Sequence, residues 1–121
     1  MERAKIRNFQ DLEIWQRSMQ LVEKVYRLTK SFPRDELYGL TSQLRRSAVS
    51  IPSNIAEGFN RNHKAEFKQF LHISLGSCAE VLTQLTIASR LSYIENNETK
   101  SLLKEIDEIS KMIMSLIKKL S

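Results

Sequence analysis

Apolar residues recur every three to four positions along most of the chain, which is the period of one face of an α-helix. The pattern breaks at Phe32-Pro33, after Gly58 and at Asn96-Asn97, and it predicts helices over residues 12–31, 35–58, 63–94 and 98–120. Only 3 Gly and 2 Pro are present, too few for the turns of a β-rich fold. We therefore expect an all-α protein with one domain over residues 1–121, an antiparallel up-down-up-down four-helix bundle that begins with a flexible segment over residues 1–10.

The first helix carries a broad apolar face, and Asp11 is its expected N-cap. The central stripe is expected to comprise Leu12, Trp15, Met19, Val22, Tyr26 and Thr29. Four further residues widen that stripe: Ile14, Leu21, Val25 and Leu28. Because one bundle core does not need so wide a face, we expect the surplus to contact a second copy of the chain in a homo-oligomer.

Apolar side chains of the third and fourth helices repeat in steps of four and three, the spacing of left-handed helix packing. The third stripe comprises Phe67, Leu71, Ser74, Cys78, Val81, Leu85 and Ala88. The fourth comprises Leu102, Ile106, Ile109, Ile113, Leu116 and Leu120, with Glu105, Asp107, Glu108, Lys111 and Lys118 facing water. Gly76 lies in the middle of the third helix, where we expect a close approach by Ser47, Ala48 and Ser50 of the second helix.

Pro52 disturbs the second helix, because it removes one backbone hydrogen bond and clashes with the carbonyl four residues earlier. One interpretation is a continuous helix kinked at Pro52. The other is a helix that stops at Val49 and a new helix that begins at Pro52 with Ser50 as its N-cap. The kinked helix keeps the polar residues of this segment in one stripe and is therefore preferred, and Gly58 is expected to end the helix in both interpretations.

Polar residues of the second helix fall on one narrow stripe at spacings of three and four. These residues are Gln43, Arg46, Ser50, Asn54, Glu57 and Arg61. A merely solvated face would carry interchangeable Lys and Glu, so the stripe calls for another explanation. Either its side chains bond to one another inside the bundle or a subunit interface, with Glu57 paired to Arg46 or Arg61, or the stripe binds a partner.

Residue patterns that support catalysis or metal binding are missing from the sequence. No acidic residue is followed three positions later by His, as a di-iron bundle requires, and His63 and His72 have no other plausible ligand near them. Cys78 lies on an apolar stripe, and Gly39, Gly58 and Gly76 are too dispersed to form a phosphate loop. We therefore expect a protein without enzymatic activity, cofactor or metal.

The chain carries 19 Lys+Arg against 14 Asp+Glu, which gives a formal charge of +5 and favours polyanionic partners. The candidate nucleic-acid-binding residues are Arg45, Arg46, Arg61, Lys64 and Lys68. No exposed aromatic ladder accompanies them, so contacts with RNA or DNA would be to phosphates and of low sequence specificity. A protein-binding scaffold with no nucleic-acid contact is the alternative.

Other features indicate where the protein resides. Cys78 is a single cysteine, which excludes an internal disulfide and suits a reducing compartment. The first residues lack the apolar region of a signal peptide, and no apolar run approaches the ~18 to 20 residues of a membrane span. We therefore expect a soluble cytoplasmic protein that does not associate with membranes.

Three segments resemble a known family: FQDLEIWQRSMQL, YGLTSQLRRSAVSIPSNIAEG and FLHISLGSCAEVLTQL. They are similar to the four-helix-bundle proteins encoded in intervening sequences of 23S ribosomal RNA genes, also labelled S23 ribosomal proteins. The most specific motif is SIPSNIAEG over residues 50–58 followed by Arg61, and next comes Gly76-Ser77 with Glu80. Where the family usually has Ser, this chain has His63, so Asn62 is expected to cap the third helix.

The resemblance implies a ring-like homopentamer with no established enzymatic activity. The family is in turn similar to the accessory variability protein of diversity-generating retroelements, a basic pentameric bundle that binds a reverse transcriptase and nucleic acid. By this resemblance, we expect an adaptor that binds nucleic acid and is accessory to either a reverse transcriptase or an rRNA intervening sequence.

Overall fold

The computed structural model describes residues 6–121, which contain four α-helices and no strand. The helices are α1 (Glu13–Thr29), α2 (Leu40–Asn60), α3 (Lys64–Arg90) and α4 (Asn96–Lys119), with short 3-10 helices η1 (Phe9–Asp11) and η2 (Arg34–Glu36). The all-α class and the four-helix bundle are therefore confirmed. Half of the segment expected to be flexible, residues 1–5, lies outside the described residues.

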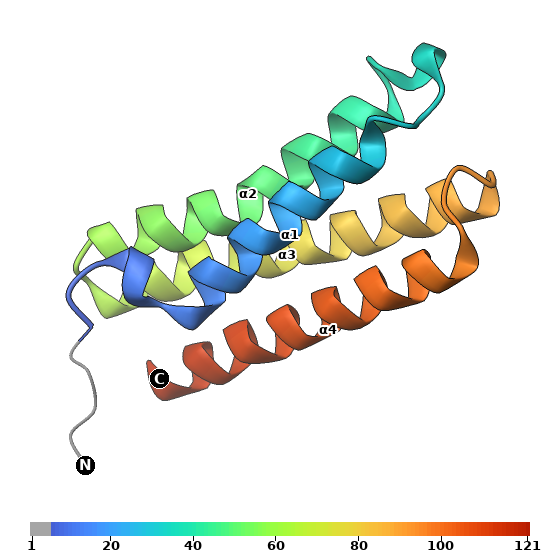
Figure 1. Ribbon diagram of the computed structural model, residues 1–121. Helices are drawn as coiled ribbons and strands as arrows, with labels where there is room; N and C mark the ends of the chain where they lie inside the picture. Colours follow the sequence, from blue (N-terminus) through green and yellow to red (C-terminus); the bar gives the residue numbers. More distant parts are fainter. Residues whose placement is uncertain (1–5) are drawn as a thin grey trace.

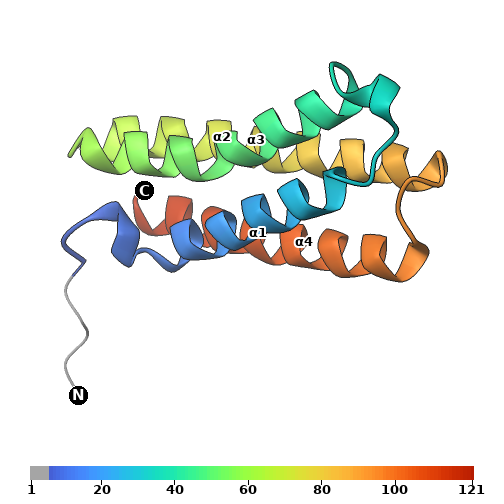
Figure 2. The same ribbon diagram turned by 45° about the horizontal axis from the view of Figure 1, so that its top comes forward.

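The connections between successive helices lie at alternate ends of the bundle. The turns from α1 to α2 and from α3 to α4 share one end, and the turn from α2 to α3 lies at the other end with the C-terminus (Figure 1). Figure 2 shows two layers, one formed by α2 with α3 and the other by α1 with α4. The α2 to α3 turn is only three residues long, so these two helices are close neighbours along their length.

The apolar face of α1 is centred differently from the sequence prediction. Ile14, Leu21, Val25 and Leu28, expected to widen the stripe, are the buried core residues. Trp15 and Val22 of the expected central stripe are only partly buried, and Tyr26 is exposed. Both sets have the same helical period, so the period cannot tell which one faces the core. The expected surplus apolar face is thus the half-exposed set, not the four residues to which it was assigned.

The core stripes of α3 and α4 agree with the predicted heptad steps. Leu71, Ser74, Cys78, Val81, Leu85 and Ala88 of α3 are buried, as are Leu102, Ile106, Ile109 and Ile113 of α4. Glu105 is a correction, because its side chain is buried rather than facing water. Its Oε2 accepts a hydrogen bond of 2.8 Å from Nζ of Lys24, so the buried carboxylate has a partner of opposite charge.

The starts of α1, α3 and α4 differ from those expected in their capping or turn residues. Asp11 is not the N-cap of α1, since its Oδ2 accepts from the backbone N–H groups of Arg7 and Asn8 and closes η1 instead. Asn62 does not cap α3; its φ of 55° is left-handed, and His63 holds the N-cap position. Asn96 begins α4 instead of forming the turn before it. Local backbone geometry and, at Asp11, side-chain hydrogen bonds set these boundaries, and the apolar period does not report them.

The second helix begins later than expected because the Glu36 carboxylate turns back onto it. Oε1 of Glu36 accepts a hydrogen bond of 3.2 Å from the backbone N–H of Leu40, the first residue of α2. Leu37, expected on the apolar stripe, precedes the helix and is 47% exposed. Gly58 does not end α2, which continues to Asn60.

Pro52 lies inside an uninterrupted α2, so the alternative of two helices with Ser50 as N-cap is wrong. The kink itself stays a prediction. Two side chains donate to backbone carbonyls beside the proline: Oγ of Ser74 to Ile51 at 3.0 Å and Nδ2 of Asn54 to Ser50 at 2.8 Å. They do not replace the bond that Pro52 removes, whose acceptor is the carbonyl of Ala48 four residues earlier.

Within the described part of the chain, α3 is long and apolar enough to cross a membrane by length and composition alone. Core helices of bundles pass the same test. The buried residues of α3, among them Leu71, Val81 and Leu85, pack in the core with the other three helices.

Candidate functional site

The polar stripe of α2 is partly built into the contact with α3. Oγ of Ser77 donates a hydrogen bond of 2.8 Å to Oγ of Ser50, and Nδ2 of Asn54 donates to the same hydroxyl oxygen at 2.9 Å. Ser50 and Asn54 are half-buried by this arrangement. The middle of the stripe therefore connects the two helices through small hydroxyl groups and one amide.

Towards the start of α2 the same stripe lines an open groove of about 460 Å³. Its walls are Gln43, Arg46, Ser47 and Ser50 of α2 and Glu80 and Gln84 of α3. Arg46 and Glu80 are exposed, and neither forms an ion pair with any of residues 6–121. Oε1 of Gln84 is buried yet accepts no hydrogen bond from the described residues. The groove thus gathers Arg46, Glu80 and Oε1 of Gln84, none of which has a partner among residues 6–121.

At the other end of the stripe, Glu57 and Arg61 lie one helical turn apart. Their side chains form an ion pair of 3.4 Å and are 56% and 48% exposed. The Arg61 guanidinium also lies over the ring of Phe70, 5.2 Å from its centroid. An exposed pair of this kind contributes only about 0.3–0.5 kcal/mol, so it does not hold the bundle together.

The five candidate phosphate-binding residues fall into two groups. Arg61, Lys64 and Lys68 lie around the α2 to α3 turn, whereas Arg45 and Arg46 lie near the start of α2. At 1.5 Å per residue, Arg46 and Arg61 are about 22 Å apart along the helix. No ion pair involves Lys64 or Lys68 in the described region.

Arg45 is held by α1. Its Nε donates a hydrogen bond of 2.8 Å to Oγ1 of Thr29, and its guanidinium lies 4.8 Å from the centroid of the Tyr26 ring. Tyr26 was expected to pack in the core but is 40% exposed and instead carries this cation–π contact. Arg45 therefore points towards the α1 side of the bundle, away from the groove that contains Arg46.

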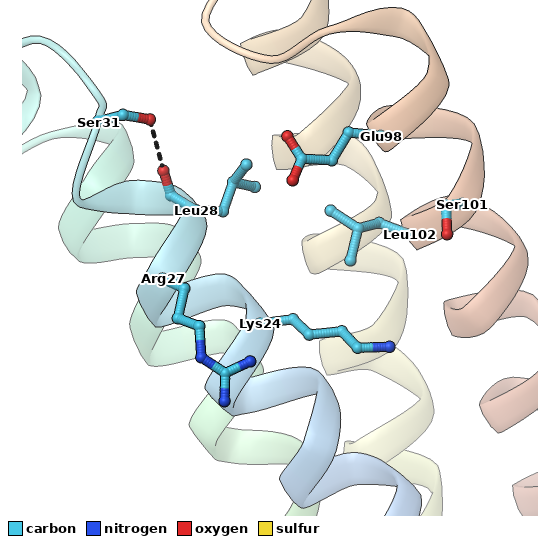
Figure 3. Close-up of a pocket in the computed structure, with 7 residues that line it drawn as sticks. All are labelled: Lys24, Arg27, Leu28, Ser31, Glu98, Ser101 and Leu102. Carbon is cyan, nitrogen blue, oxygen red and sulfur yellow. Dashed lines mark hydrogen bonds between the residues drawn. The ribbon is translucent and has the colours of Figure 1, made fainter.

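A second cavity, of about 370 Å³, lies between α1 and α4 (Figure 3). Leu28 and Leu102 form its apolar part, and Lys24, Arg27 and Glu98 surround them. Three of its polar side chains have partners: Lys24 pairs with Glu105, Arg27 pairs with Glu23, and the Ser31 hydroxyl donates to the Leu28 carbonyl at 3.0 Å.

Two features of the described region bear on its reactivity: the Cys78 thiol and the placement of the His, Cys, Asp and Glu side chains. Cys78 is 1% exposed, and burial raises the pKa of its thiol, so little thiolate forms near neutral pH. No group of three or more His, Cys, Asp or Glu side chains within residues 6–121 is placed to hold a metal ion. The chemistry available at the α2–α3 surface is therefore hydrogen bonding and charge pairing.

Sequence reasoning placed the α2 half of the groove but missed Gln84 on α3. A signal for it was present, because Ser77, Glu80 and Gln84 follow one another at spacings of three and four. These positions form a polar stripe on α3 that matches the stripe on α2.

The fold and this paired polar surface define a small four-helix bundle with an open polar groove between α2 and α3. The chain belongs to the 23S rRNA-intervening sequence protein family, whose sequence pattern matches residues 10–115. A solved structure of similar fold is a protein of unknown function from the S23 ribosomal protein family of Bacteroides thetaiotaomicron. It is 26% identical, covers 87% of this chain and 98% of its own, and superposes with a TM-score of 0.80. No curated protein matches the sequence.

Proposed function

We propose that this protein is a non-enzymatic, oligomeric adaptor that binds RNA or DNA with low sequence specificity through phosphate contacts. The observation that carries the proposal is the position of Lys64 and Lys68, two cations without an ion-pair partner in the described region, beside Arg61 at the exposed α2 to α3 turn. Lys and Arg side chains at such a site attract phosphates over roughly a Debye length, about 8 Å at physiological salt. Arg46 in the α2–α3 groove and Arg45 on the α1 side add two further, weaker phosphate contacts.

Oligomerisation strengthens such binding. A net charge of +5 per chain is multiplied by the number of subunits, and phosphate contacts repeated round an assembly reinforce one another. Following the family resemblance, we propose a homopentamer that is accessory to a reverse transcriptase or acts with the RNA of an rRNA intervening sequence. Identifying the neighbouring genes distinguishes these two settings.

A protein-binding scaffold with no nucleic-acid contact is the competing function. It is supported by the exposed apolar side chains of α3, such as Ile73 and Ile87, which are 50% and 43% exposed. The two functions differ in what salt does to them, because binding through phosphates releases counterions and binding through apolar surface does not.

The test is fluorescence anisotropy with a structured RNA and a DNA duplex at salt concentrations between about 50 and 200 mM. We expect the affinity to fall by orders of magnitude over this range. Lys64→Glu with Lys68→Glu should weaken binding and make the dependence of log affinity on log salt less steep by about two. Lys100→Glu with Lys104→Glu is the matched control, since both residues are exposed and equally spaced on α4.

The Lys100→Glu, Lys104→Glu control shows whether binding depends on the contact at Lys64 and Lys68 or only on the net charge of the protein. Equal weakening by both double variants would mean that net charge alone attracts the nucleic acid. Absence of binding at the lowest salt concentration would leave the scaffold as the function.

A further inference from the structure

Gly76 lies in the interior of α3, where glycine stabilises a helix less than alanine does. We expected the backbone of α2 to approach it closely, and this expectation is wrong. A Cβ built on Gly76 would have no atom of the described residues within 4 Å, and the residue is exposed. No packing contact among residues 6–121 requires the glycine, and its face of α3 is open to another molecule.

The residues around Gly76 form an outward face of α3 with a symmetrical order. Ile73 and Ile87 lie seven residues before and after Glu80, and Gly76 and Gln84 lie four residues before and after it. Offsets of four and seven keep all five on one face of a helix. In either direction along the helix, this face therefore has an isoleucine at each end and Glu80 at its centre.

We propose that this face binds a second copy of the same chain, with the two α3 helices packed antiparallel about a two-fold axis at Glu80. In this arrangement Ile73 of each copy meets Ile87 of the other, which removes two exposed apolar side chains per chain from water. Gln84 of each copy lies over Gly76 of the other, where the missing side chain leaves space for it.

Charge complementarity favours a second copy over an unrelated protein. Arg46 and Glu80 line the same groove and have no ion-pair partner in the described region. The two-fold axis brings two arginines and two glutamates together, a cluster of zero net charge in which each Arg46 reaches the Glu80 of the other copy. One surface thus supplies both members of each pair, as an isologous contact requires.

This contact is separate from the main nucleic-acid contact around Arg61, Lys64 and Lys68, and it shares only Arg46 with the weaker part of that contact. It also differs from the contact that closes a ring, because a ring joins two different surfaces whereas a two-fold contact joins a surface to itself. The contact gives either a dimer or a pair of rings.

Cysteine cross-linking tests the axis directly. Glu80→Cys places two thiols beside each other only if the contact is two-fold, so mild oxidation should give a covalent dimer. Cys78 is buried, and Glu108→Cys on exposed α4 measures any background reaction. A monomer at every concentration measured, or a larger assembly that forms no Glu80→Cys cross-link, overturns the proposal.

Charge reversal tests the pairing. Sedimentation equilibrium should show that Arg46→Glu and Glu80→Arg each weaken self-association by at least about tenfold, because like charges then meet at the axis. The double variant restores the opposite charges and should recover most of the affinity. Reversing Asp107 and Lys111, an ion pair on α4, should have no effect. Failure of the double variant to recover the association contradicts the proposed contact.

Gly76→Ala distinguishes an effect on the contact from an effect on folding, because the self-association affinity and the free energy of unfolding should change in opposite directions. In the isolated chain, alanine has room and favours the helix, so the free energy of unfolding should rise. Association should weaken, and Gly76→Leu should weaken it further. Association unchanged by Gly76→Leu would show that no second copy lies over this position.

Discussion

The Tyr93 hydroxyl donates a hydrogen bond of 2.9 Å to Oε2 of Glu36, although 57 residues separate the two in the sequence. The other carboxylate oxygen accepts from the backbone N–H of Leu40 at 3.2 Å. Phe32 packs beside them, with its ring centroid 5.5 Å from that of Tyr93. One carboxylate therefore joins the turn before α4 to the start of α2, at the end of the bundle where two connections meet (Figure 1).

Because of this hydrogen bond, the free energy of unfolding depends on pH in the alkaline range. Donation to Glu36 raises the pKa of Tyr93, since an ionised phenolate could no longer donate. The folded protein therefore keeps its proton where the unfolded chain, with a pKa of about 10, has lost it. The contribution is complete below that pH and disappears as the pH rises through the folded pKa.

Tyr93→Phe checks this pH dependence. The variant should have a lower urea midpoint than the wild type at neutral pH, and the difference should shrink above a pH of about 10. Cys78 has a raised pKa as well, so part of the alkaline loss should persist in Tyr93→Phe and diminish in Cys78→Ala. A difference between wild type and Tyr93→Phe that stays constant with pH contradicts the assignment.

Gly58 should tolerate no side chain. A Cβ at this position would lie 2.6 Å from Cβ of Phe70 and 3.1 Å from Cδ1 of Phe67. We expect Gly58→Ala to reduce the free energy of unfolding by about 1–3 kcal/mol, the typical effect of overpacking. The matched control is Gly76→Ala in the same assay, which should change stability in the opposite direction. Equal effects at both positions would mean that backbone propensity, and not contact with Phe70, governs Gly58.

Ser74 connects α3 to the segment around Pro52. It is fully buried and donates to the Ile51 carbonyl at 3.0 Å. Ser74→Ala should lower the free energy of unfolding by about 1 kcal/mol, measured by urea titration. Thr83→Ala is the comparison, because Oγ1 of Thr83 donates within its own helix to Ala79 at an exposed site and its loss should change stability by less than about 0.5 kcal/mol.

Lys24 and Glu105 should act as a unit. The Lys24 side chain is 49% exposed and that of Glu105 only 10%, so removing the lysine leaves a nearly buried carboxylate without its partner. After allowance for solvent screening at Lys24, we expect Lys24→Met to reduce the free energy of unfolding by about 1–2 kcal/mol. Lys24→Met combined with Glu105→Leu should recover most of the loss. Additive losses in the double variant would contradict this coupling.

The helical period alone predicted the number of helices and the cores of α3 and α4, because stripes such as Leu71 to Leu85 have only one apolar face. On α1 two overlapping apolar stripes share one period. The sequence therefore could not show whether the stripe of Leu21 and Val25 or that of Trp15 and Val22 faces the core. The side of the helix that faces the core depends on where α2 and α4 lie, which is not a local property.

Glycines show the same limit. A close approach was a sound reason for a helical glycine, but the sequence assigned it to Gly76 when it belongs to Gly58, which packs against Phe70. The α2 half of the groove could be predicted because Arg46 and Ser50 lie on one helix and the helical period places them on one face. The α3 half could not, because which residues of α3 lie opposite them depends on how α2 packs against α3.

Because Cys78 is buried, the rate at which its thiol can be labelled measures how often the bundle opens. A thiol-specific reagent cannot reach a side chain that is 1% exposed, and protonation further suppresses its reaction. Labelling must therefore wait until the helices around it separate, and its rate counts those openings without any introduced probe. Because Cys78 is the only cysteine in the chain, every modified molecule records an opening of the same place in the core.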